Sequence, residues 1–136
     1  MKHEISKKNE IIISAITVAA GFPSPAENYI EEHLDLNKYL IKINEATFFV
    51  RVSGDSMVNV GIYNNDIIIV DKSLSPKNKS IVIASLNGEL VVKRFLINKK
   101  NECYLQSEND NYPKIKLDSN MDTAIWGVAR HVIHQL

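Results

Sequence analysis

The chain has 136 residues, of which 45% are hydrophobic and 24% charged, enough for one hydrophobic core and short for two. The charges of its 16 basic and 16 acidic side chains cancel, and Lys and Arg are not clustered in a run that could form a basic DNA-binding surface. We therefore expect no sequence-specific DNA binding. The single cysteine, Cys103, excludes an internal disulfide and favours a reducing compartment, the cytoplasm.

Cysteine and histidine do not suggest a metal centre. The histidines stand at positions 3, 33, 131 and 134, and the last two lie in a strand-like tail without a carboxylate or thiol close in the sequence. We therefore expect no metal site, and nothing in the sequence points to a cofactor. Cys103 follows Glu102 in strand-like sequence, and we expect it to be a buried structural thiol.

The first twenty residues have two interpretations. Basic residues precede a mostly apolar run from Ile11 to Ala20 that ends in small residues, and these are the parts of a secretory signal peptide. Acidic and polar residues interrupt the approach, and the run is too short to span a bilayer, so we expect no membrane anchor. The alternative is an extended arm, rich in Ile, Thr and Val, whose small residues could lie in a narrow cleft. Both interpretations place a cleavage after Ala20.

A hinge and a short helix are expected next. Residues 21–25 read Gly-Phe-Pro-Ser-Pro, which neither a helix nor a central strand tolerates. Ser24, Pro25 and Glu27 fit an N-cap, a first-turn proline and a capping-box carboxylate, and they predict a helix with Leu34 on its apolar side, continuing as a broken turn to Tyr39. We divide the chain into a cleavable arm (1–20), a hinge with a short helix (21–39) and a β-rich domain (40–136).

From residue 40 the sequence predicts β structure. Asn87-Gly88 between two apolar runs is a strong hairpin signal, and a two-residue loop sets Lys93 opposite Val82. The expected fold is mainly β, a compact sandwich or barrel rather than a parallel sheet. The predicted strands cover residues 47–52, 66–71, 80–86, 89–97, 102–106, 112–117 and 124–133.

Two side chains of this region suggest nucleophilic catalysis. Strand-like sequence leads into Gly54-Asp55-Ser56-Met57, where Gly54 lets the backbone bend and leaves the Ser56 hydroxyl at the end of a turn. Lys93 stands among apolar residues in a strand, where desolvation lowers the pKa of an ammonium and makes a neutral amine available as a general base. Lys93 could then take the proton of Ser56, the Ser-Lys variant of nucleophilic catalysis. Spacing alone leaves open that Ser56 is a turn serine and that Lys93 reaches solvent.

Four pieces in order resemble the LexA/UmuD family of self-cleaving SOS-response proteins. They are Ser-Gly-Asp-Ser-Met at 53–57, the strand at 66–71 after a turn, the Asn87-Gly88-Glu89 hairpin ending in Val92-Lys93, and Ala20-Gly21 located 36 residues before the serine. The Gly-Phe-Pro-Ser-Pro-Ala segment at 21–26 and Asp-Leu-Asn at 35–37 point to the UmuD branch in particular.

The resemblance implies a LexA/signal-peptidase-like β fold and a peptidase activity whose substrate is the protein's own N-terminal arm. By carry-over Ser56 is the nucleophile, Lys93 the general base and Ala20/Gly21 the scissile pair, while the backbone amides of Ser56 and Asp55 form the oxyanion site.

The residues of the scissile bond suit this role by themselves. The small side chain of Ala20 lets its carbonyl approach the serine, and Gly21 permits a bend that a β-carbon would obstruct. Val18 could fill an apolar pocket.

The partners that the resemblance implies are a RecA filament on single-stranded DNA, which stimulates cleavage, and a UmuC-like subunit of a translesion DNA polymerase, which the shortened product serves as a homodimer. The apolar run from Trp126 to Ile133 is a candidate dimer surface. LexA-like repressors carry a helix-turn-helix domain before the cleavage site, and twenty residues cannot hold one, so we expect no operator binding.

Two alternatives stay open beside this interpretation. One is a signal-peptidase-like Ser-Lys peptidase that acts on other chains, and the other is a non-catalytic β interaction module.

Overall fold

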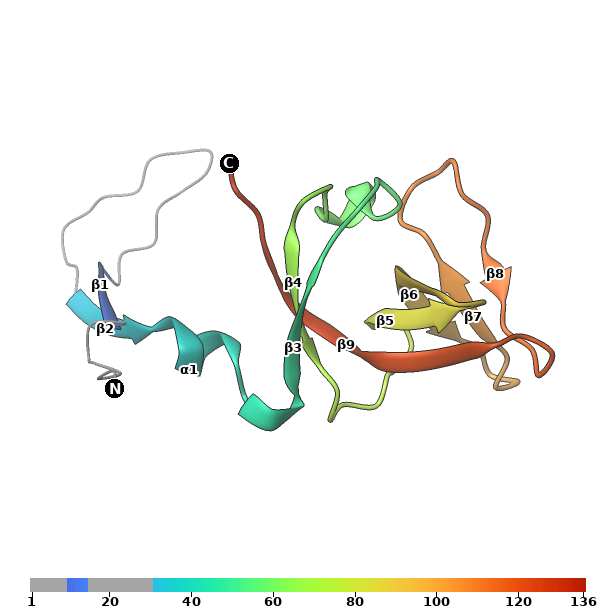
Figure 1. Ribbon diagram of the computed structural model, residues 1–136, viewed down its shortest axis with the longest axis horizontal. Coiled ribbons are helices and arrows are strands. Elements are labelled where there is room, and N and C mark those ends of the chain that lie inside the picture. The colour runs from blue at the N-terminus through green and yellow to red at the C-terminus, as the bar shows by residue number, and fades with distance from the viewer. Residues whose placement is uncertain (1–9, 15–30) are drawn as a thin grey trace. The chain divides into compact units, whose positions relative to one another are not determined.

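The computed structural model describes residues 10–14 and 31–136, and the chain divides into two compact units, residues 1–42 and 43–136 (Figure 1). In the first unit, strand β1 (Glu10–Ser14) pairs with β2 (Glu31–Asp35) in antiparallel register, with Ile12 opposite His33. The extended conformation expected for the Ile-rich part of the arm is therefore confirmed for residues 10–14.

The one α-helix of the described residues, α1 (Leu36–Leu40), follows β2 directly. The Asp35 carboxylate caps it by accepting hydrogen bonds from the backbone N–H of Asn37 at 3.0 Å and of Lys38 at 3.4 Å. The prediction that this helix extends over Leu34 was wrong, because residues 31–35 form a strand. Pairing with β1 satisfies the backbone of this segment, so tertiary context overrides the local helix signal. The proposed cap, Ser24, lies outside the described residues.

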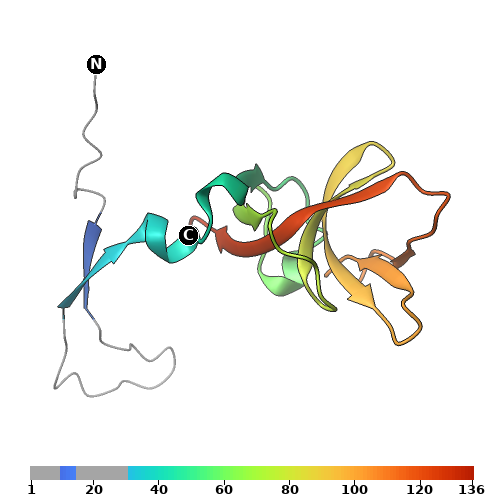
Figure 2. The ribbon, with the colours of Figure 1, turned by 90° about the horizontal axis from the view of Figure 1, so that it is seen from below.

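The second unit is one seven-stranded sheet in the order β3-β4-β9-β5-β6-β7-β8, with antiparallel neighbours throughout (Figures 1 and 2). The long strand β9 lies inside the sheet, between β4 and β5. The elements are the 3₁₀-helix η2 (Asn44–Ala46), β3 (Thr47–Arg51), the 3₁₀-helix η3 (Val58–Val60), β4 (Ile67–Asp71), β5 (Ile81–Leu86), β6 (Glu89–Ile97), β7 (Cys103–Gln106), β8 (Ile115–Lys116) and β9 (Thr123–Ile133).

The predicted β fold and its central hairpin are confirmed. Asn87 and Gly88 both have positive φ, 51° and 89°, which a two-residue turn of this kind requires, and Lys93 stands opposite Val82. Six of the seven predicted strands are present within one residue of the expected ends. The strand expected at 112–117 is reduced to Ile115–Lys116, since Tyr112 turns toward Asp55 and Pro113 has no N–H to donate.

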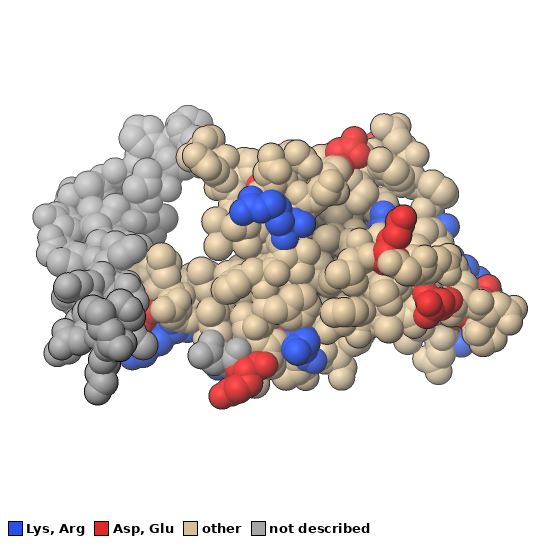
Figure 3. Space-filling view, viewed as in Figure 1, with Lys and Arg blue, Asp and Glu red and all other residues tan. Residues whose placement is uncertain are grey.

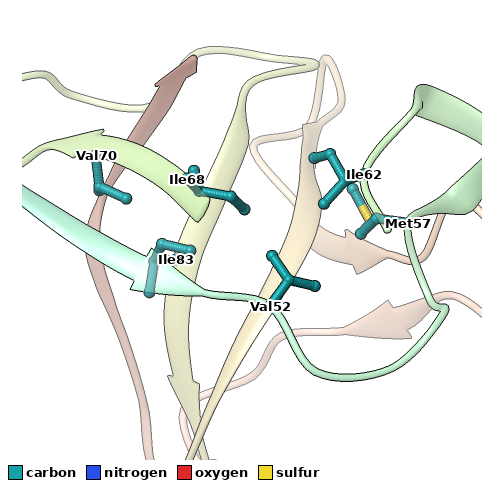
Figure 4. Packing of buried hydrophobic residues seen from close by; sticks show 6 residues of the cluster. All are labelled: Val52, Met57, Ile62, Ile68, Val70 and Ile83. Atoms are coloured by element: carbon teal, nitrogen blue, oxygen red, sulfur yellow. The ribbon is translucent and has the colours of Figure 1, made fainter. Parts of the chain in front are cut away.

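Two clusters of buried apolar side chains hold the sheet together. Val82, Ala84, Phe95, Leu105 and Val128 form one of them. The other consists of Val52, Met57, Ile62, Ile68, Val70 and Ile83, and Figure 4 shows how Met57 and Ile62 extend it beyond the strands, under the loop that follows β3. This second cluster supports the turn that carries Ser56.

The surface carries charges of both signs. On the face drawn in Figure 3, cationic and anionic side chains are scattered rather than gathered by sign. No helix of the described residues is both long and apolar enough to cross a membrane.

Candidate active site

The turn after β3 presents Ser56 half-buried on a fixed backbone. Gly54 has a φ of +97°, a conformation that favours glycine, and its N–H donates to the side-chain oxygen of Asn64 at 2.9 Å. The carbonyl of Asp55 accepts a hydrogen bond from the N–H of Val58 at 3.4 Å. The next side chain, Met57, is only 2% exposed and anchors the turn in the core.

Lys93 comes from the middle of β6 and is half-buried. Burial lowers the pKa of its ammonium from the ordinary value of 10.5, the direction that a general base needs. Its Nζ donates a hydrogen bond to Ser107 Oγ at 2.6 Å and lies 5.6 Å from the centre of the Tyr112 ring. The amine therefore sits between a hydroxyl and an aromatic face.

One pocket of about 300 Å³ brings the two predicted catalytic side chains together. Ser56 and Lys93, 37 residues apart in the sequence, both line it. No hydrogen bond joins them among the described residues, which is common for catalytic pairs without substrate. The remaining lining is mostly apolar and consists of Val50, Arg51, Val52, Ser53, Met57, Ile83, Leu90, Val91 and Val92.

The backbone amides expected to form an oxyanion site are free to do so. Within residues 43–136, the N–H groups of Asp55 and Ser56 donate no hydrogen bond to the protein. Asp55 is exposed and Ser56 is half-buried, so two adjacent open donors beside the hydroxyl are suited to bind an oxygen atom of a substrate. Their role stays a prediction.

A loop that sequence reasoning missed holds the Ser56 turn in place. Asn109 Nδ2 donates to the Asp55 carbonyl at 2.9 Å, and the Tyr112 hydroxyl donates to the Asp55 carboxylate at 2.9 Å. The bond to Asp55 raises the pKa of Tyr112. The N–H of Glu108 donates to Met57 Sδ at 3.4 Å, so residues 108–112 bind the turn at several points.

The same loop also holds the lysine strand. Ser107 is 5% exposed and accepts the hydrogen bond of Lys93, while the next residue, Glu108, forms a half-buried ion pair of 2.8 Å with Arg94. Residues 107–112 therefore contact both the Ser56 turn and β6. Their polar sequence, Ser-Glu-Asn-Asp-Asn-Tyr, is typical of any surface connection, and no local signal could have assigned them to the site.

His134 meets a carboxylate that is distant in the sequence: its Nδ1 lies 2.6 Å from Oδ1 of Asp66, a 3% exposed residue 68 positions earlier. The expectation for Cys103 was wrong. Cys103 is half-buried rather than buried, and its thiol donates a weak hydrogen bond to the carbonyl of Asn101 at 3.8 Å. The contact of His134 depends on how distant segments meet.

The predicted scissile pair and the residue expected in an apolar pocket, Ala20, Gly21 and Val18, lie outside the described residues. The structure describes only the pocket that they are predicted to meet.

Comparison with known proteins identifies the class. The family model described as peptidase S24-like matches residues 11–130. The chain belongs to the peptidase S24-like family. The predicted peptidase class thereby has support that does not depend on the pocket.

The relatives place the chain more narrowly within the family. It is 43% identical to protein ImpA of Salmonella typhimurium over 85% of this chain and 78% of that protein. It is 40% identical to protein MucA of Escherichia coli over 84% of this chain and 77% of that protein. It is 38% identical to the LexA repressor of Shewanella denitrificans over 85% of this chain and 56% of that repressor. ImpA and MucA are UmuD-like proteins of SOS mutagenesis, so the predicted UmuD-like membership and SOS-response function are confirmed.

Proposed function

We propose that the chain cuts its own arm between Ala20 and Gly21, with Ser56 as nucleophile and Lys93 as general base. The observation that carries the proposal is the shared pocket, on whose wall a half-buried amine with a lowered pKa faces the same space as a half-buried hydroxyl. A family of peptidases supplies the reaction class.

The reaction runs in two stages. Neutral Lys93 Nζ takes the hydroxyl proton of Ser56 while Oγ attacks the carbonyl carbon of Ala20, and the oxyanion accepts hydrogen bonds from the amides of Asp55 and Ser56. The Lys93 ammonium then gives its proton to the departing nitrogen of Gly21, which leaves an ester between Ser56 and residues 1–20. Water, deprotonated by the same amine, hydrolyses that ester and regenerates both side chains.

The pocket suits a small, apolar substrate segment. Val50, Val92 and the half-exposed Leu90 offer apolar walls against which Val18 packs in the docked arm. Docking also displaces water from around Lys93, and this lowers its pKa further and raises the neutral fraction. The arm thus helps to activate the base that cuts it.

Cleavage must be controlled, because the arm is covalently linked to the catalytic unit and its scissile bond therefore has a high effective concentration at the active site. We propose that the arm is mostly undocked and that a RecA filament on single-stranded DNA favours the docked state. The product, residues 21–136, then acts as a homodimer in the cytoplasm with a UmuC-like translesion polymerase subunit. Trp126, Val132 and Ile133 on β9, each at least 40% exposed, are offered as part of the dimer surface.

The test is incubation of the purified full-length chain at alkaline pH, alone and with RecA filaments, followed by mass spectrometry of the new termini. We expect a fragment that begins at Gly21 and no fragment from Ser56→Ala or Lys93→Ala. An intact wild-type chain under both conditions would contradict the proposal and favour a non-catalytic module. Cutting of added unrelated peptides with the arm intact would favour a peptidase that acts on other chains.

A further inference from the structure

The Lys93 amine has a polar neighbour that the reaction above does not use. Ser107 Oγ accepts a hydrogen bond from Nζ at 2.6 Å, a short distance for a bond between nitrogen and oxygen. The serine is 5% exposed, so its hydroxyl is directed to the site rather than to solvent. A buried hydroxyl on the base of a predicted catalytic pair is a candidate for a role in the reaction.

We propose that Ser107 is a positioning residue, whose hydroxyl holds one N–H of Lys93 and thereby aims the lone pair of the neutral amine at Ser56. This inference rests on the proposed function, because it assigns a third side chain to the same reaction. A free lysine side chain has four rotatable bonds, and only some of its conformations direct the lone pair into the pocket. One fixed N–H removes most of the others.

Ser107 can do this only if it is itself fixed, and its surroundings meet that condition. It follows β7 directly. Its neighbour Glu108 is held by three contacts: an ion pair with Arg94 at 2.8 Å, an N–H donated to Met57 Sδ at 3.4 Å, and a carbonyl that accepts the N–H of Asn59 at 2.8 Å. Through Glu108, the backbone beside Ser107 is therefore anchored both to β6, the strand that carries Lys93, and to the turn that carries Ser56.

The charges around the amine leave Ser107 as its one hydrogen-bond partner among the described residues. Tyr112 presents its ring to Nζ at 5.6 Å and directs its hydroxyl to the Asp55 carboxylate instead. Arg51 lines the same pocket but donates a hydrogen bond to the carbonyl of Asn65 at 3.0 Å, and Val82 opposite Lys93 is uncharged. The nearby carboxylate of Glu108 is already paired with Arg94.

This arrangement predicts opposite effects on basicity and on rate. A hydrogen bond to the ammonium favours the charged form, so its loss in Ser107→Ala should lower the pKa of Lys93 and increase the neutral fraction at a given pH. The rate should nevertheless fall, since the lone pair is no longer aimed. A residue that only fills space would change neither the titration nor the pH at which the rate levels off.

The direct test is NMR titration of the Lys93 side chain in the Ser56→Ala background, where the chain stays intact. We expect Ser107→Ala to lower the midpoint by about one pH unit, because a hydrogen bond to a charged group is typically worth one to two pKa units. Ser107→Thr should restore the wild-type midpoint. Ser85→Ala, a change at a half-buried serine of β5, is the matched control and should leave it unchanged.

Ser107→Cys covers the case in which alanine disturbs folding, because a thiol fills the site but accepts hydrogen bonds weakly. It should move the midpoint in the same direction as alanine. An unchanged midpoint in a folded Ser107→Ala or Ser107→Cys variant would overturn the proposal.

Cleavage then separates this inference from the function on which it rests. With Ser56 restored, Ser107→Ala should cleave at least about tenfold more slowly than the wild type at the high-pH plateau, and Ser107→Thr should recover most of the rate. Plateau cleavage at the wild-type rate in Ser107→Ala would overturn the positioning role. A wild-type chain that never cleaves would overturn the proposed function, while the NMR titration would still decide whether Ser107 holds Lys93.

Discussion

Met57→Ala tests whether the nucleophile turn depends on the core beneath it. The Met57 side chain is 2% exposed and packs with Val52, Ile62 and Ile68, which are 7%, 4% and 1% exposed, so water cannot fill the space that alanine leaves. Loss of the buried thioether chain costs about 2 kcal/mol of transfer free energy. The cavity adds about 1 to 2 kcal/mol, since backbone hydrogen bonds on both sides limit collapse. We expect the free energy of unfolding to fall by about 3 to 4 kcal/mol.

Urea unfolding followed by circular dichroism measures this loss, again in the Ser56→Ala background so that the chain remains whole. Met57→Leu is the matched control. It keeps the volume but removes the sulfur that accepts the N–H of Glu108, and it should cost less than about 1.5 kcal/mol. A loss below about 1 kcal/mol for Met57→Ala, with an unchanged dependence on urea, would refute the reasoning, because it would mean that the turn is not packed as the structure describes.

Two further predictions concern the sheet and its acid stability. A Cβ added at Gly127 would lie 2.7 Å from Cγ1 of Val70, which is fully buried. Gly127→Ala should therefore lower the free energy of unfolding by about 1 to 3 kcal/mol, and Val70→Ala added to it should recover part of that loss. Urea unfolding measures both effects, and a Gly127→Ala variant as stable as the wild type would contradict the packing. Burial raises the pKa of Asp66, but hydrogen bonds from His134 and from the N–H of Tyr63 outweigh it, and the pKa is lowered from 3.8. The ionised Asp66 carboxylate therefore stabilises the fold fully above pH 3.8, and this stabilisation is lost as the pH falls through the folded-state pKa. Asp66→Asn should make the free energy of unfolding depend less on pH at the acid end. An unchanged dependence in the variant would be the contrary result.

Local sequence determined the strands and the hairpin well. Alternating apolar residues and the Asn87-Gly88 turn define the register without help from the rest of the chain, and so Lys93 could be placed opposite Val82 in advance. The two-residue turn leaves little freedom in the pairing register of β5 and β6, and this is why β6, which carries Lys93, was the most predictable part of the site.

Features that depend on distant contacts could not be predicted in this way. The helix predicted to extend over Leu34 is absent there because β2 pairs with a strand some twenty residues earlier, and Asp35 then caps the helix that follows. Ser107 and Tyr112 reach the site through a polar loop whose sequence does not distinguish it from any exposed connection. His134 finds Asp66 only when β9 lies beside β4. Each of these contacts forms only when segments distant in the sequence come together.

The dependence of the self-cleavage rate on pH, measured on the wild-type chain, tests the central claim most directly. If neutral Lys93 activates Ser56, the rate rises about tenfold per pH unit and levels off at a midpoint below 10.5, the ordinary lysine pKa, since burial lowers the pKa of this amine. A rate that does not change with pH, or that keeps rising beyond pH 10.5, would contradict the claim that a half-buried lysine is the base.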